Sequence, residues 1–131
     1  SSRVMWREKG RAENYIYYEG INPNKKWGED FFWKIKKNQL SFKQDKWYTI
    51  KTHIKLNPAG KKDLVESWLD NKRVIYQKLS IRKKNSTFGI DYFNFTVFFG
   101  GNDNTWAPVK DEFIYFDKFI ISNKPINESV K

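Results

Sequence analysis

The stretch Trp47-Tyr48-Thr49-Ile50-Lys51-Thr52-His53-Ile54-Lys55-Leu56 alternates between side chains suited to a protein core and side chains suited to water. Successive side chains of a β-strand point to opposite faces of a sheet, so every second residue shares a face. One face would carry Tyr48, Ile50, Thr52, Ile54 and Leu56, and the other Thr49, Lys51, His53 and Lys55. The pattern predicts a strand with one wet side, which is typical of antiparallel sheets.

The same signals recur along the chain and predict an all-β protein. Segments rich in aromatic and β-branched residues are expected to form further strands at roughly 2–7, 14–19, 30–36, 64–70, 73–81, 88–99 and 112–121. Turn-forming residues separate them, and no segment keeps a helical apolar period. Short antiparallel strands at this spacing predict a β-sandwich of jelly-roll type.

We expect the sandwich to occupy residues 1–122, with a C-terminal tail at 123–131. The 131 residues suit one domain, and 39% of them are hydrophobic, which is enough for a sizeable core. The expected core comprises Val4, Trp6, Ile16, Tyr18, Ile50, Ile54, Val97, Phe99 and Phe119.

Composition excludes several kinds of site. Cysteine is absent and His53 is the single histidine. Disulfides, thiolate metal sites and cysteine nucleophiles are therefore excluded, and a histidine-built zinc site is disfavoured. The aspartates show no calcium-loop spacing, so neither a metal nor another cofactor is expected. No apolar run approaches the ~20 residues that span a bilayer, so no membrane partner is expected.

The net charge of +10 comes from 25 lysines and arginines against 15 aspartates and glutamates. Such a surplus attracts polyanions in general, whether nucleic acid, anionic lipid or acidic polysaccharide. The lysines are scattered along the chain, and a solvated surface accounts for most of them. The charge therefore indicates the sign of the partner rather than its identity.

The first expected hairpin, with strands 2–7 and 14–19 around Gly10, has an unusual polar face. If Arg3 pairs with Tyr17, one face carries Val4, Trp6, Ile16 and Tyr18, and the other Arg3, Met5, Arg7, Tyr15 and Tyr17. An arginine beside two tyrosines is suited to hold an anion and move protons. The alternative is an ordinary exposed face on which arginine stacks on tyrosine.

Several motifs in a fixed order resemble one enzyme family. They are Ser1-x-Arg3, Tyr15-x-Tyr17, Phe98-Phe99-Gly100-Gly101-Asn102-Asp103 and Trp106-Ala107-Pro108, with Trp47-Tyr48-x-Ile50, Leu56-Asn57, Trp68-Leu69-Asp70 and Phe116-Asp117-x-Phe119 as supporting context. Together they resemble the alginate-lyase-type polysaccharide lyases of family 14. The resemblance spans nearly the whole chain, and its order and spacing are more specific than any single piece.

The resemblance implies a β-jelly-roll that cleaves an acidic polyuronate, such as alginate or a glucuronate polymer, by β-elimination. It implies that Arg3 neutralises the substrate carboxylate, that Ser1 gives a supporting hydrogen bond, and that Tyr15 and Tyr17 carry the proton transfers. Which tyrosine is the base and which the acid stays open. Arginine fits the first role because its planar fork matches a carboxylate.

The family also has a catalytic lysine on a strand upstream of the Ser-x-Arg motif, whereas here that motif opens the chain. We therefore expect the chain to be the C-terminal part of a catalytic domain, completed by a preceding segment of the same protein. The resemblance further implies a secreted or extracellular location.

Four residues on polar faces are expected to bind further uronates: Arg82, Lys34, Lys51 and His53. For any one of them, plain surface solvation is the commoner role. Two other functions stay open. One is a non-catalytic, lectin-like module for acidic glycans, and the other is a nucleic-acid-binding β domain, although no specific recognition motif supports the latter.

Overall fold

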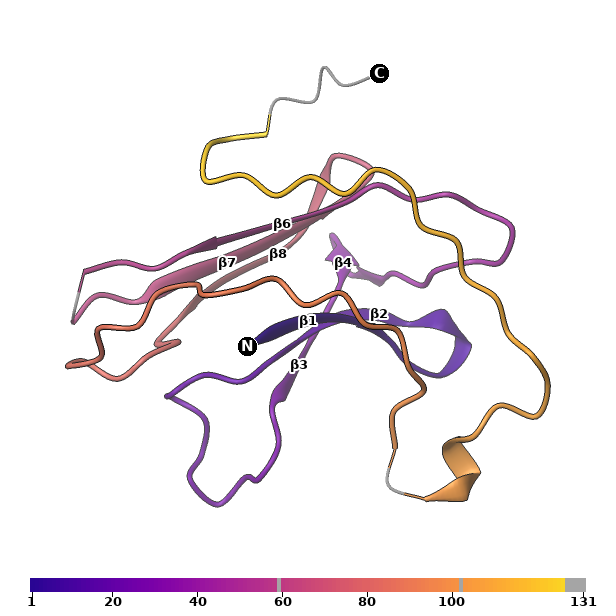
Figure 1. Ribbon diagram of the computed structural model, residues 1–131, viewed down its shortest axis with the longest axis horizontal. Helices are drawn as coiled ribbons and strands as arrows, with labels where there is room; N and C mark the ends of the chain where they lie inside the picture. Colours follow the sequence, from indigo (N-terminus) through magenta and orange to yellow (C-terminus); the bar gives the residue numbers. More distant parts are fainter. Residues whose placement is uncertain (59, 102, 127–131) are drawn as a thin grey trace. The chain divides into compact units, whose positions relative to one another are not determined.

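The computed structural model describes residues 1–58, 60–101 and 103–126. The chain divides into two compact units, Ser1–Asp91 and Tyr92–Lys131 (Figure 1). Asn102 of the predicted Phe98–Asp103 motif and residues 127–131 of the predicted tail lie outside the described residues. Within the described ranges, no helix is long and apolar enough to cross a membrane.

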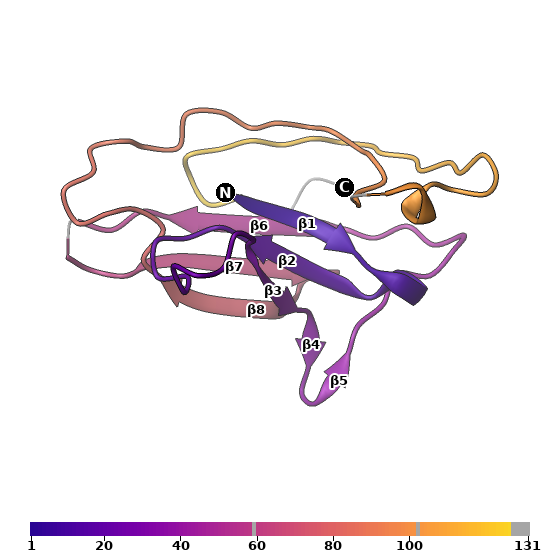
Figure 2. The ribbon, with the colours of Figure 1, turned by 90° about the horizontal axis from the view of Figure 1, so that it is seen from below.

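The first unit is built from three antiparallel sheets. The first sheet has the order β1-β2-β3, the second pairs β4 with β5, and the third has the order β6-β7-β8. The strands span Ser2–Trp6 (β1), Ala12–Ile16 (β2), Glu29–Phe32 (β3), Lys34–Ile35 (β4), Asn38–Gln39 (β5), Ile50–Lys55 (β6), Asp63–Leu69 (β7) and Lys72–Leu79 (β8) (Figure 2). The prediction of an all-β protein with antiparallel sheets is confirmed, and the jelly-roll connectivity stays a prediction.

The first hairpin forms as predicted, but its register differs by two residues. Arg3 lies opposite Tyr15 rather than Tyr17. A short 3₁₀ turn at Glu8–Gly10 closes the hairpin, with Lys9 at a φ of 59° and Gly10 at a φ of 72°. This turn centres the hairpin on Lys9 and not on Gly10. Because a shift of two residues keeps every side chain on its face, the predicted division into two faces survives.

The third sheet contains β6, the strand expected from the alternation of residues 47–56. Ile50 to Lys55 pairs with β7, and β7 pairs with β8 across an irregularity between Ser67 and Trp68. Val65, Ser67 and Leu69 of β7 are buried. The facing residues of β6 that share this side include Thr52, whose hydroxyl lies 3.1 Å from the hydroxyl of Ser67. The opposite side of the sheet carries Lys51 and His53, as predicted.

The core of the first unit joins residues from the three sheets. Its buried apolar members are Ala12, Ile16, Trp33, Val65, Leu69, Val74, Ile75 and Leu79, with Val4 and Tyr18 packed against them. The predictions of Ile16, Val4 and Tyr18 are thus correct. Trp6 and Ile50 were wrongly placed in the core: each is 43% exposed, because each lies at one end of an outer strand of its sheet.

A buried polar bond lies in the middle of this core. The indole Nε1 of Trp33 donates a hydrogen bond of 2.7 Å to Oδ1 of Asn14, and both side chains are fully buried. The amide nitrogen of Asn14 donates in turn to Oγ of Ser2 at 3.2 Å. Buried polar groups are costly unless they are paired, so this bond holds β2 in one register against the segment that follows β3.

The second unit departs from the prediction. Segments 88–99 and 112–121 form no strand, and no backbone hydrogen bond joins them. They meet through side chains, with the ring of Phe95 4.8 Å from Phe116 and 4.6 Å from Phe119 between centroids. Strand propensity measures fit to a paired, half-buried surface, and these residues lack a ladder partner here. The predicted core positions Val97, Phe99 and Phe119 are accordingly exposed, which corrects that part of the core.

The Gly100-Gly101 pair has a clear structural role in the second unit. Gly101 adopts a φ of 131°, and a Cβ there would collide with the indole of Trp106. Trp106 belongs to a 3₁₀ turn at Asn104–Trp106, whose start is capped by Asp103, because its carboxylate accepts a hydrogen bond of 2.9 Å from the backbone nitrogen of Thr105. Two of the quoted motifs therefore pack on each other, and glycine is needed at the contact.

The buried bond of Trp33 gives the first prediction. Trp33→Phe should lower the free energy of unfolding by about 2–4 kcal/mol, because it leaves Oδ1 of Asn14 unpaired and a void beside it. Urea unfolding followed by circular dichroism would measure the loss. Trp27→Phe is the matched control, since Trp27 is 69% exposed and should change stability little. Equal losses in the two variants would contradict the role given to this bond.

Candidate active site

The outward side of the first sheet gathers the residues that the sequence singled out. On β1 and β2, Arg3 lies opposite Tyr15, and the backbone nitrogen of Tyr17 donates a hydrogen bond of 2.9 Å to the carbonyl of Ser1. Strand β3 adds Asp30, which lies opposite Tyr15 on the other side. We call this surface the hairpin face, defined by Ser1, Arg3, Arg7, Glu13, Tyr15, Tyr17 and Asp30. It points away from the core, because Asn14 and Ile16 alternate with its members and are buried.

The two tyrosines form a compact pair beside two arginines. Their ring centroids are 5.4 Å apart and the rings are nearly perpendicular, at 88°. The guanidinium carbon of Arg3 lies 5.5 Å from the centroid of Tyr17, and that of Arg7 lies 5.4 Å from the centroid of Tyr15. Such contacts favour the observed ring positions without neutralising the cations.

Arg7 forms ion pairs with two carboxylates. Its Nε lies 2.6 Å from Oε1 of Glu13, and its Nη2 lies 2.7 Å from Oδ1 of Asp30. The side chain of Glu13 is fully buried, and its Oε2 has no hydrogen-bond partner among the described residues. Burial first, and then the nearby Asp30, raises the pKa of Glu13 to about 6 against the opposing pull of Arg7. Arg7 thus compensates buried negative charge.

Unlike Arg7, Arg3 has no carboxylate partner among the described residues. It is exposed, and no carboxylate of the described chain forms an ion pair with it. Its guanidinium lies over the ring of Tyr17. An arginine that is held by an aromatic ring and lacks a carboxylate presents its donors to a ligand. Arg3 is therefore the cation of the hairpin face that is suited to bind an anionic group.

The ring of Tyr15 packs closely against the backbone of Gly28. A Cβ added at Gly28 would lie 2.9 Å from Cε1 of the Tyr15 ring and 2.9 Å from the carbonyl oxygen of Ile16. Burial first, and then the neighbouring Tyr17, raises the pKa of the Tyr15 hydroxyl, and a hydrogen bond involving the backbone of Gly28 opposes this shift. Tyr15 therefore keeps its proton more firmly than a free tyrosine would.

Four residues of this arrangement were not predicted as site residues: Glu13, Asp30, Gly28, and Arg7, which was placed on the polar face without a role. Glu13 was missed because the second strand was expected to begin at residue 14, whereas β2 begins at Ala12. Asp30 and Gly28 belong to another part of the sequence, and they reach the hairpin face only through the pairing of β3 with β2. The even spacing of Glu13, Tyr15 and Tyr17 was the available signal for the first of them.

The four residues expected to bind further uronates lie away from the hairpin face. Lys34 is exposed on β4, which belongs to another sheet. Lys51 and His53 lie on β6, with Nζ of Lys51 4.7 Å from the centroid of Trp68 and Nδ1 of His53 3.1 Å from Oε2 of Glu66. Their roles in substrate binding stay predictions.

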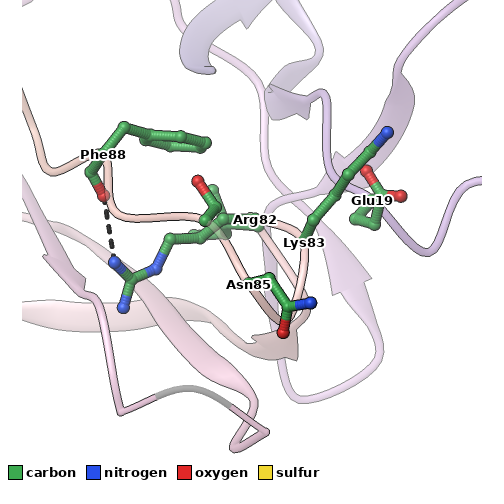
Figure 3. Close-up of a pocket in the computed structure, with 7 residues that line it drawn as sticks. Glu19, Arg82, Lys83, Asn85 and Phe88 are labelled. Carbon is green, nitrogen blue, oxygen red and sulfur yellow. Dashed lines mark hydrogen bonds between the residues drawn. The ribbon is translucent and has the colours of Figure 1, made fainter.

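Arg82 follows β8 and holds a loop together (Figure 3). Its Nη1 donates to the carbonyl of Phe88 at 2.9 Å, and its Nη2 donates to the carbonyl of Asn57 at 2.6 Å. A cavity of about 360 Å³ lies beside it, lined also by Glu19, Lys83 and Asn85. Two donors of this guanidinium are thus used within the protein.

The described residues contain no group of three or more histidines, cysteines, aspartates or glutamates placed to hold a metal ion. The polar side chains of the hairpin face are those of serine, arginine, tyrosine, aspartate and glutamate. These groups can bind a carboxylate and transfer protons.

Of the comparisons with known proteins, the one with family models finds a match. No curated protein and no solved structure matches the chain at a significant level. The sequence model of the family described as polysaccharide lyase 14 matches residues 1–119, which include the whole hairpin face and the contacting rings of Phe95, Phe116 and Phe119. The match covers most of the chain, and the chain therefore belongs to polysaccharide lyase family 14.

Proposed function

We propose that the chain takes part in cleaving an acidic polyuronate by β-elimination at the hairpin face, with alginate or a glucuronate polymer as the substrate and an extracellular location. The observation that carries the proposal is the position of Arg3, exposed and without a carboxylate partner in the described chain, next to the tyrosine pair. Membership of a lyase family supports the reaction class.

The reaction needs a base, a proton donor and a group that neutralises the substrate carboxylate, and these side chains can supply all three. A base removes the proton at C5 of the uronate, the electron pair forms the C4–C5 double bond, and the C4–O4 bond breaks as O4 gains a proton. The C5 proton becomes acidic only when the adjacent carboxylate is neutralised, because the negative charge then spreads onto it. Arg3 would bind that carboxylate as charge develops, which lowers the barrier. Ser1, opposite Tyr17, would support this contact.

The surroundings of the two tyrosines favour a division of their roles. The pKa of Tyr15 is raised, chiefly by burial, so its hydroxyl is suited to donate a proton to the departing O4. Tyr17 has the guanidinium carbon of Arg3 5.5 Å from its ring centroid, so it lies beside the group that would bind the uronate carboxylate and hence close to the adjacent C5. We therefore assign proton donation to Tyr15 and proton removal to Tyr17.

A binding-only, lectin-like function would use the same surface without turnover, and a nucleic-acid-binding function would use the same positive charge. Cleavage separates them from the proposal, because the product contains a double bond conjugated to the carboxylate that absorbs in the ultraviolet. Retention of alginate without the rise in absorbance would favour the lectin-like function. Retention of DNA in preference to alginate would favour the nucleic-acid binder.

The role of Arg3 predicts a specific loss. In the full-length natural protein, Arg3→Ala should lower kcat/KM on alginate by ~10²–10³-fold, because it removes charge stabilisation of the transition state. Arg3→Lys should recover part of the activity, since it restores the charge without the planar fork. The initial rate of ultraviolet absorbance gives both values. An Arg3→Ala variant as active as the parent would show that another group binds the carboxylate.

The roles of the tyrosines can be told apart by the leaving group. Tyr15→Phe and Tyr17→Phe should each lower kcat on the natural polymer by ~10²–10⁴-fold while preserving the fold. On a uronate with an aryloxy group at C4, which leaves without protonation, the loss in Tyr15→Phe should largely disappear and that in Tyr17→Phe should persist. Tyr92→Phe, at a side chain that is 80% exposed in the second unit, is the control. The opposite pattern of rescue would reverse the assignment.

The contact beneath Tyr15 gives a further prediction. Gly28→Ala should displace the Tyr15 ring, because the new methyl group would lie 2.9 Å from its Cε1. We expect kcat to fall by about 10-fold or more, since small misplacements of a reacting group are costly. Gly89→Ala is the matched control, because nothing lies within 4 Å of a Cβ there. Equal activity of the two variants would show that the ring position does not limit the reaction.

A further inference from the structure

The third sheet has an outward side of its own, which the hairpin face does not include. Because Val65, Ser67 and Leu69 are buried, the residues that alternate with them on β7 point away from the core. Their partners on the neighbouring strands point the same way. We call this surface the outer face. It consists of Lys51, His53 and Lys55 on β6, Leu64, Glu66 and Trp68 on β7, and Arg73, Tyr76 and Lys78 on β8.

The outer face combines cations with aromatic rings. Nζ of Lys51 lies 4.7 Å from the centroid of Trp68, and Tyr76 has the guanidinium carbon of Arg73 at 4.9 Å and Nζ of Lys78 at 5.9 Å. An aromatic ring attracts a cation but does not cancel its charge. Tyr76 is also 45% exposed, so part of its ring is open to a ligand. Positive charge and apolar surface therefore occur side by side.

The charges of the outer face are strongly unequal. Leaving Lys51 aside, Lys55, Arg73 and Lys78 share the surface with one carboxylate among the described residues, that of Glu66. Glu66 is nearly buried, and it pairs with Arg73 at 3.2 Å and with His53 at 3.1 Å. The surplus positive charge repels itself in the free protein, and a ligand carrying carboxylates would relieve this repulsion.

These features fit one kind of ligand better than others. A uronate ring has an apolar C–H side that can pack on tyrosine or tryptophan, and a carboxylate that can pair with lysine or arginine. Neighbouring strands are ~5 Å apart, so cations on successive strands could meet successive carboxylates of one extended polymer. Nucleic acid would share the electrostatic attraction, but it gains most from bases stacked flat on fully open rings, and Trp68 is only partly exposed.

We propose that the outer face is a second, non-catalytic binding site for an acidic polysaccharide. The ligand class rests on the proposed function, whereas the site itself rests on the geometry of the third sheet. The core cluster lies between the two sheets, with Ile16 from one and Val65 from the other, so the two faces point to opposite sides of the first unit. The outer face would therefore hold a separate stretch of polymer, or another chain, while the hairpin face cleaves.

The test compares two double charge reversals in the full-length protein. Lys55→Glu with Lys78→Glu alters the outer face, and Lys37→Glu with Lys43→Glu makes the same change of net charge elsewhere; all four lysines are exposed. Each pair is placed in the Tyr17→Phe background, which prevents cleavage without removing the ring. Binding to sodium alginate is measured by affinity electrophoresis at low and high salt, with duplex DNA as the competing ligand.

We expect the outer-face pair to raise the Kd for alginate by about 10-fold or more, and the control pair to raise it much less. Equal effects of the two pairs would overturn the proposal, and so would a loss of DNA binding without a loss of alginate binding. Circular dichroism and urea unfolding confirm that each variant is folded. Absence of lyase activity in the parent would refute the proposed function alone, because retention on alginate is measured without turnover.

Discussion

Strand β2 contributes side chains both to the core and to the hairpin face, because successive side chains of a strand point to opposite sides. Ala12, Asn14 and Ile16 enter the core, while Glu13 and Tyr15, with Tyr17 just beyond the end of the strand, belong to the hairpin face. A slip of one residue would exchange the two sets, burying tyrosine hydroxyls and exposing the core. The bond from Trp33 to Asn14 opposes that slip, since it can form in one register only. The geometry of the candidate site thus depends on a polar bond on the other side of the strand.

Arg3 on β1 and Arg7, just after the end of β1, show how burial gives two like residues different roles. Arg3 and Arg7 share the hairpin face, and each lies over a tyrosine ring. Arg7 is next to Glu13, which is fully buried, and removing one partner of a buried charge pair leaves the other uncompensated. Its position is therefore fixed by the fold. Arg3 forms no ion pair with a carboxylate of the described chain, so its charge can pair with a ligand.

The sequence was sufficient for the strands that alternate clearly and for the division of the first hairpin into two faces. It could not supply the register, because the turn is centred on Lys9 in a left-handed conformation and glycine was the stronger signal. Nor could it supply the contributions of Gly28 and Asp30, which depend on the pairing of β3. Segments 88–99 and 112–121 were overpredicted as strands, since composition reports the propensity of a segment and not the presence of its partner.

The order of the first sheet gives its two working strands unequal resistance to local opening. Strand β2 is paired on both sides, whereas β1 is an outer strand and is paired with β2 alone within this sheet. Outer strands exchange their amide hydrogens through openings of lower free energy than central strands do. Arg3 therefore lies on the strand that opens more easily, and Tyr15 lies on the strand that opens less easily. A bound carboxylate would add its binding free energy to the closed form of β1, so the substrate itself would complete the ordering of the arginine that receives it.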